Sequence, residues 1–184
     1  MIQSEFLIDM PLTNLGVDGD DTTGVLARFK DELERRLGQE QTIIVFAIGI
    51  NDSQISPKTG KFRTPPELFT QNIHDLINKA RSYTDKIFFV GLTPTEDNKV
   101  DPIPWLPEMS YRDGCVQQFN NILKSVCADE RVPFLDVYPK FKKRNVSDLL
   151  IDGLHPNGKG HKIIFDMVLS HIGDISEGKW KKFN

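Results

Sequence analysis

Thr42-Ile43-Ile44-Val45-Phe46-Ala47-Ile48 is the stretch of this 184-residue chain that decides its fold. The run is apolar and rich in β-branched residues, a composition that favours a strand. Polar residues do not alternate with apolar ones along it. We therefore expect both faces of the strand to be buried, as in a parallel sheet that is covered by helices on both sides.

Further strands and helices alternate on both sides of this run. Ile87 to Leu92 and Val132 to Val137 have the same apolar, β-branched character. Apolar residues at helical spacing predict helices within residues 22–37, 64–80, 116–126 and 157–168. Connections of this length allow right-handed crossovers between parallel strands. The sequence therefore predicts one α/β domain over residues 1–184, a three-layer α/β/α sandwich with a mostly parallel sheet.

Several boundaries of these elements are marked by local signals. Asp21 or Thr22 can cap the first helix, and Asn157 can cap the last. Thr64-Pro65-Pro66-Glu67 matches a capping box with proline at the first helical position. Residues 5–13 contain Pro11 and are predicted to form an edge-like strand at best.

Composition excludes several functional classes. A net charge of −3 gives no electrostatic reason to expect binding to nucleic acid or to an anionic membrane. No apolar run is long enough for a membrane span, and no signal peptide is visible at Met1, so a cytoplasmic protein is expected. Cys115 and Cys127 lie twelve residues apart on one predicted helix, too far along it to bridge, which fits a reducing compartment.

Asp152-Gly153-Leu154-His155-Pro156-Asn157 carries the clearest catalytic signal. A carboxylate and an imidazole lie three residues apart in a loop marked by glycine and proline. A histidine held by a carboxylate can take a proton from a hydroxyl nucleophile. Taken alone, the motif is better explained as loop and helix-cap chemistry. A metal site that also uses His161 is not expected, because neither a cysteine partner nor a His-Glu-x-x-His pattern is present.

Two other loops are predicted to reach the same edge of the sheet. In an open α/β sheet, sites form outside the carboxyl ends of the strands. Asn14-Leu15-Gly16 offers a backbone amide, and Gly49-Ile50-Asn51-Asp52 offers a side-chain amide directly after the first apolar run. Two donors and a base at one point describe half of an acyl-transfer site with an oxyanion hole. Each loop alone could equally be turn chemistry.

These three blocks, in this order, resemble the SGNH hydrolases, also called GDSL esterases and lipases. The resemblance covers about residues 14–170. It implies that His155 is the general base, that Asp152 orients it, and that the Gly16 amide and the Asn51 side chain stabilise the oxyanion. It also implies a five-stranded parallel sheet and substrates that are small-molecule carboxylic esters of lipids, alcohols or sugars. No metal ion or cofactor is expected.

One block of that family has no counterpart in this sequence. The family's nucleophile is the serine of a Gly-Asp-Ser block on the first, central strand, and none of the thirteen residues before Asn14 forms it. The chain either begins downstream of that strand or has lost the nucleophile, and we favour the first explanation. In both cases we expect it to hydrolyse esters poorly or not at all. The alternative function is a catalytically silent binding module with the same fold.

A sheet without its central strand exposes two strand edges, which predicts association or strand swapping into homo-oligomers. Four large side chains in or beside the long loops could line a substrate pocket or could be half-buried anchors: Phe62, Trp105, Leu106 and Tyr111. Asp52 is predicted to stabilise its loop.

Overall fold

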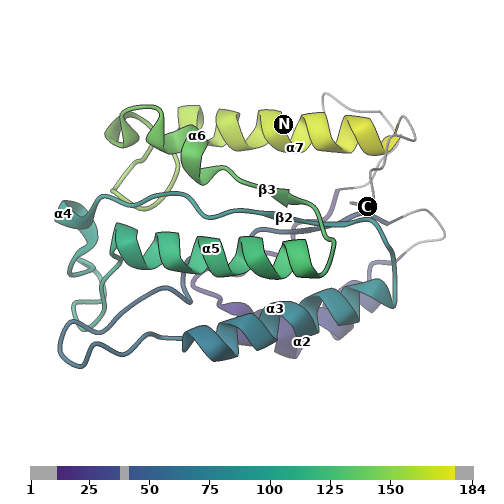
Figure 1. Ribbon diagram of the computed structural model, residues 1–184, viewed down its shortest axis with the longest axis horizontal. Helices are drawn as coiled ribbons and strands as arrows, with labels where there is room; N and C mark the ends of the chain where they lie inside the picture. The colour runs from purple at the N-terminus through teal and green to yellow at the C-terminus, as the bar shows by residue number, and fades with distance from the viewer. Residues whose placement is uncertain (1–11, 38–41, 177–184) are drawn as a thin grey trace.

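The strands β1 (Ile44–Phe46), β2 (Ile87–Val90) and β3 (Phe134–Leu135) form a parallel sheet in the order β1-β2-β3. These are the strands in the computed structural model, which describes residues 12–37 and 42–176 (Figure 1). Each is shorter than the apolar run that predicted it. The predicted α/β class and the parallel sheet are confirmed.

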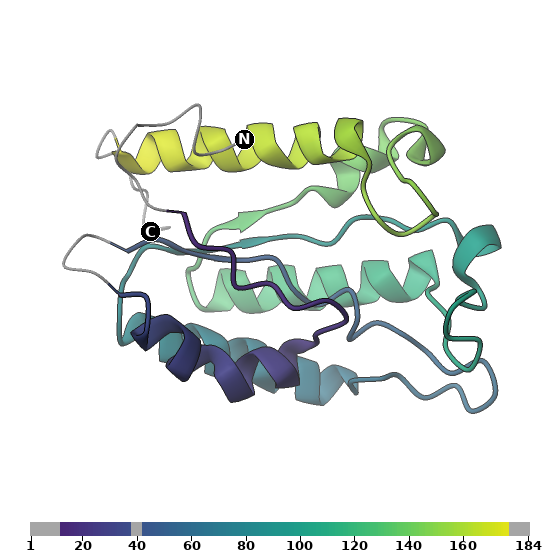
Figure 2. The ribbon, with the colours of Figure 1, turned by 180° about the vertical axis from the view of Figure 1, so that it is seen from behind.

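Helices cover both faces of this sheet (Figures 1 and 2). One face carries α2 (Thr22–Glu34), α3 (Pro66–Arg81) and α5 (Asp113–Asp129). The other carries α6 (Tyr138–Lys142) and the long α7 (Gly158–Ser176). Two short helices lie in connections, α4 (Asp97–Val100) and the 3-10 helix η1 (Val146–Asp148). Within the described part of the chain, no helix has the length and apolarity needed to cross a membrane.

The central strand β2 divides the core into two apolar clusters. Ile87 and Phe89 belong to the larger cluster, which includes residues of α2, α3 and α5. Phe88 and Val90 point the other way and join the cluster that α6 and α7 cover. All four side chains are buried, as expected for a strand with helices on both sides.

The strand β1 departs from the prediction. Ile44 and Phe46 are buried, but the side chain between them, Val45, is 42% exposed. Full burial of the run 42–48 is therefore wrong at Val45 and at Ala47, which is also exposed. In the described residues β1 pairs only with β2, so it is an edge of the sheet. The resemblance implied five strands where the described residues form three; most of the predicted strand at 5–13 lies outside them, and Leu12 and Thr13 are not in a strand.

The helix ends confirm two local predictions and correct a third. Asp21 caps α2 by accepting from the Gly24 amide, and the Asn157 side chain caps α7. The α3 helix has proline at its start as predicted, but its N-cap is Pro65, and no side chain caps it. The expected capping box is absent because Thr64 instead hydrogen-bonds to the buried Asp52.

Candidate active site

The loop between η1 and α7 brings Asp152 against His155. Asp152 Oδ2 lies 2.7 Å from His155 Nδ1. Its other oxygen accepts the backbone amides of Leu154 at 3.0 Å and His155 at 2.8 Å. The loop is closed by a hydrogen bond from the Ile151 amide to the His155 carbonyl, at 2.8 Å. Carboxylate and imidazole therefore form a pair that the loop itself holds in place.

The surroundings of this pair favour a charged carboxylate and an available ring nitrogen. Burial alone would raise the pKa of Asp152, but hydrogen bonds from the His155 amide and ring and from the Leu154 amide lower it overall. When Nδ1 donates to Asp152, Nε2 becomes the basic nitrogen of the neutral ring. The His155 side chain is 60% exposed, so solutes can reach it.

Three contacts fix the loop on its neighbours. Gly153 has φ +91, and a Cβ atom there would lie 2.7 Å from Lys99 Cβ on α4, so a side chain is excluded by conformation and by space. The Gly153 carbonyl also accepts the Glu96 amide at 2.8 Å. Trp105, which is 57% exposed, stacks on His155 with ring centroids 6.1 Å apart. Trp105, one of the four loop side chains, therefore lies beside the imidazole.

Asn51 lies in the loop after β1 and contacts the segment that follows the Gly16 block. Its Nδ2 donates to the Asp20 carbonyl at 2.7 Å, across 31 residues of sequence. The adjacent Asp52 is fully buried and accepts the Thr22 amide at 3.1 and 3.2 Å and the Thr22 hydroxyl at 2.5 Å. Desolvation raises the pKa of Asp52 although these bonds oppose it. Asp52 thus anchors the start of α2, as predicted for a loop-stabilising carboxylate.

The loop that contains Gly16 is tied to the body of the protein by two arginines. Arg28 donates to the Leu15 carbonyl at 2.7 Å, and Arg63 donates to the Gly19 carbonyl at 2.9 Å. The Gly16 amide itself donates to Asn14 Oδ1 at 2.9 Å. In this structure the predicted oxyanion donor Gly16 is therefore already hydrogen-bonded within its own loop, and it is exposed.

Sequence reasoning missed a buried hydrogen-bond network behind Asn51. The Tyr111 hydroxyl donates to Asn51 Oδ1 at 2.5 Å, and Gln54 Nε2 donates to the same hydroxyl at 2.6 Å. Tyr111 was considered only as a pocket or anchor residue, and Gln54 was not singled out. Its spacing of three residues from Asn51 was the available signal. Asn51 and Tyr111 are separated by 60 positions in the sequence, so no local pattern indicates that they pair.

An apolar cluster brings the Asn51 and His155 blocks together. Tyr111 and Leu154 are both buried in it, and Ile50 packs against it. Ile50 precedes Asn51, and Leu154 precedes His155. Since Asn51 also contacts Asp20, segments from three distant parts of the sequence meet at this side of the molecule.

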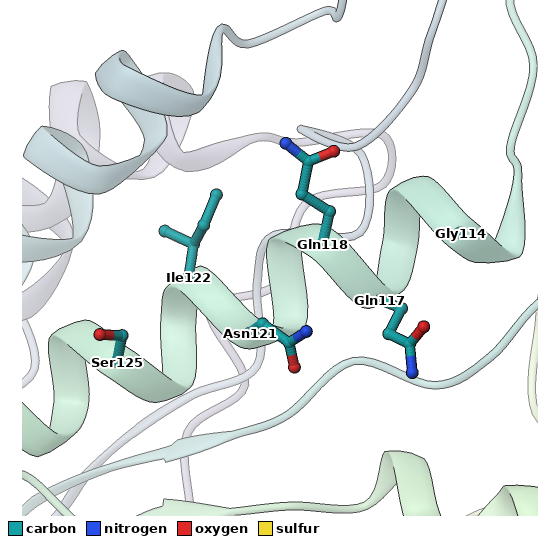
Figure 3. Close-up of a pocket in the computed structure, with 6 residues that line it drawn as sticks. All are labelled: Gly114, Gln117, Gln118, Asn121, Ile122 and Ser125. Carbon is teal, nitrogen blue, oxygen red and sulfur yellow. The ribbon is translucent and has the colours of Figure 1, made fainter.

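A shallow groove elsewhere on the surface does not coincide with these residues. Figure 3 shows its lining, which lies along one side of α5: Gly114, Gln117, Gln118, Asn121, Ile122 and Ser125. None of these residues belongs to the three blocks. Within residues 12–37 and 42–176, no group of three or more His, Cys, Asp or Glu side chains could hold a metal ion.

The sequence matches a known family over most of the chain. Residues 2–163 match the model of the GDSL-like lipase/acylhydrolase family. The chain belongs to this family. Membership confirms the resemblance that the three blocks suggested, and it makes the chain a relative of GDSL-type esterases.

Individual relatives support the same assignment. An isoamyl acetate-hydrolyzing esterase of Saccharomyces cerevisiae is 27% identical over 149 residues, which cover 74% of this chain and 59% of that protein. A lipase/acylhydrolase from Enterococcus faecalis superposes with a TM-score of 0.68 at 19% identity, covering 90% of this chain and 75% of the other. An acetylxylan esterase from Geobacillus stearothermophilus gives 0.67 at 20% identity, covering 88% and 71%. The two structures show the shared GDSL fold.

Proposed function

We propose that this chain carries the base and oxyanion side of a carboxylic ester hydrolase. The observation that carries the proposal is the Asp152–His155 pair, at 2.7 Å, in a chain of the GDSL-like lipase/acylhydrolase family. His155 Nε2 takes the proton from a serine hydroxyl and later returns it to the leaving alcohol. Asp152 holds the ring in the required tautomer and stabilises the imidazolium that forms.

The oxyanion of the tetrahedral intermediate is stabilised by Asn51 and Gly16. Asn51 Nδ2 carries two hydrogens, and the Asp20 carbonyl accepts one of them. The second is available for the oxyanion. Gly16 becomes a donor only if its amide leaves Asn14 Oδ1, which requires a small rearrangement of an exposed loop. Such donors act strongly when they are oriented before the reaction.

The ester is a small one, and Trp105 is the side chain that contacts it. Trp105 is exposed and stacks beside His155, where the leaving alcohol must receive its proton. An exposed aromatic face provides apolar surface for a short alkyl group or for the face of a sugar ring. The yeast relative is named for isoamyl acetate and the Geobacillus relative for acetylxylan, which fits an acetyl ester of either kind.

The serine nucleophile is the missing part of this proposal. The 184 residues contain no Gly-Asp-Ser block, so we propose that this chain alone hydrolyses esters slowly or not at all. A triad without its serine still retains a rate about a thousandfold above that in water. A silent binding module is the second candidate, and the internal hydrogen bond of the Gly16 amide favours it.

The test compares the 184-residue chain with the same chain extended by the in-frame codons upstream of Met1. We expect the extended chain to hydrolyse p-nitrophenyl acetate and to be labelled by a fluorophosphonate on one serine. His155→Ala should lower kcat by at least about a thousandfold, because the general base is lost. His161→Ala, on the exposed side of α7, is the matched control and should retain activity.

The two candidates give opposite results. An extended chain without a labelled serine, or equal activity of His155→Ala and the parent, would contradict the hydrolase. A stop codon shortly upstream, together with an ester analogue that binds but is not hydrolysed, would support the silent module.

A further inference from the structure

The hydrogen bonds around Asn51 run in one direction, and a backbone carbonyl sets it. The Asp20 carbonyl can only accept, so the Asn51 atom that lies 2.7 Å from it must be the amide nitrogen. Asn51 Oδ1 therefore faces the opposite way, toward Tyr111. Because Oδ1 can only accept, the Tyr111 hydroxyl must donate its single proton to it.

Gln54 completes this chain of donors. Its Nε2 donates to the Tyr111 hydroxyl oxygen at 2.6 Å, which leaves the hydroxyl proton for Asn51. In the described part of the chain, the buried Gln54 Oε1 has no hydrogen-bond partner. A buried acceptor without a partner is unfavourable. The hydrogen bond from Gln54 Nε2 to the Tyr111 hydroxyl is therefore what orients the Gln54 amide.

Burial fixes the geometry of the network. Tyr111 is 2% exposed and Gln54 is 5% exposed. The Tyr111 ring packs in the cluster that contains Leu154, the neighbour of His155. Burial raises the pKa of Tyr111, so its hydroxyl keeps its proton at neutral and moderately alkaline pH. It remains a donor wherever a histidine base would operate.

We propose that Tyr111 is a positioning residue for Asn51, and that Gln54 reinforces the direction in which Tyr111 donates. Together they hold the Asn51 amide with its nitrogen toward the space where the oxyanion forms. The role of Asn51 rests on the proposed function, whereas its orientation can be measured without turnover. The physical benefit is a donor that needs no reorientation when charge develops on the substrate.

The experiment uses the side-chain amide signals of Asn51 in 1H–15N NMR spectra of the 184-residue chain, assigned by their loss in Asn51→Asp. Tyr111→Phe removes only the hydroxyl, so the Asn51 signals should shift and show faster local motion. Tyr138→Phe is the matched control, because Tyr138 is also buried and donates to Asp113, outside this network. In Tyr138→Phe the Asn51 signals should be unchanged, even if this variant loses as much stability as Tyr111→Phe.

Gln54→Glu tests the direction of the chain. An ionised carboxylate only accepts, so it should draw the Tyr111 proton toward itself and leave Asn51 Oδ1 without its donor. The Asn51 signals should then move as pH rises and the new carboxyl ionises, and return at low pH. Asn51 signals that stay at their wild-type positions in Tyr111→Phe, or that move equally in Tyr138→Phe, would overturn the proposal.

Kinetics separate this proposal from the proposed function. In any form of the protein that hydrolyses p-nitrophenyl acetate, Tyr111→Phe should lower kcat about tenfold with KM unchanged, a fraction of the effect of losing one oxyanion donor. In an Asn51→Ala background it should have no further effect. A shift of the Asn51 signals in Tyr111→Phe, together with no ester hydrolysis by the chain extended upstream of Met1, would count against the hydrolase and would support the positioning of Asn51.

Discussion

The two halves of the candidate site are built in different ways. The base half, the loop that contains Asp152 and His155, is held by hydrogen bonds between residues two to four apart, and its two polar side chains are partly exposed. The donor half around Asn51 and Asp52 is held by bonds that span 30 to 60 residues, and its anchors are buried.

We therefore expect changes in the donor half to affect mainly the stability of the fold, and changes in the base half to affect mainly the proton transfer. A buried carboxylate with long-range partners holds helices together, so its loss affects the whole fold. An exposed carboxylate with local partners contributes little to the fold and can be specialised for a proton transfer. Asp52 and Asp152 are the same residue type in these two settings, and they allow the comparison to be tested directly.

The largest expected effect is on stability at the donor half. Asp52→Ala should reduce the free energy of unfolding by about 3 kcal/mol, because it leaves the buried Thr22 amide and hydroxyl without their acceptor. Urea unfolding followed by circular dichroism measures this. Asp21→Ala, at the cap of the same helix, is the control and should cost about 1 kcal/mol. Equal losses in the two variants would contradict a special role for burial.

The base half should show the opposite pattern. Asp152→Asn should change the free energy of unfolding by less than about 1 kcal/mol, as expected for an exposed local pair. In a form that hydrolyses esters, the same change should lower kcat by about ten-thousandfold, because the imidazole loses its orienting carboxylate. A large loss of stability would show that the loop is part of the folding core.

The smallest effect is a pair of opposite pH slopes. Burial raises the pKa of Asp52 above its ordinary value of 3.8, so the part of its contribution to stability that depends on protonation is fully present below pH 3.8 and is lost as pH rises through the folded pKa. The pKa of Asp152 is lowered, so its contribution is present above pH 3.8 and is lost as pH falls through the folded pKa.

Urea unfolding between pH 3 and pH 7 reveals the two slopes as differences between variants. The stability of the parent relative to Asp52→Asn should fall as pH rises. Its stability relative to Asp152→Asn should fall as pH decreases below 3.8. Slopes of the same sign would show that the two carboxyls do not differ in this way.

Much of the fold and half of the candidate site could be predicted because their signals are local. Apolar runs gave the strands, helical spacing gave the helices, and Asp21 and Asn157 marked helix starts. The Asp152–His155 pairing lies within one loop, so residue order alone limits its geometry. By itself, the sequence determined the α/β class, the family and this pair.

Only the tertiary structure decided how the donor half is connected. The sequence placed Asn51 after a strand, but not its contact with Asp20 or the donation from Tyr111. The sequence predicted a buried Val45, which the structure leaves partly exposed. It also predicted that Thr64 caps a helix, whereas Thr64 hydrogen-bonds to Asp52 instead. The physical reason is common to these cases: burial and long-range hydrogen bonds depend on which distant segments pack together, and no local pattern records that choice.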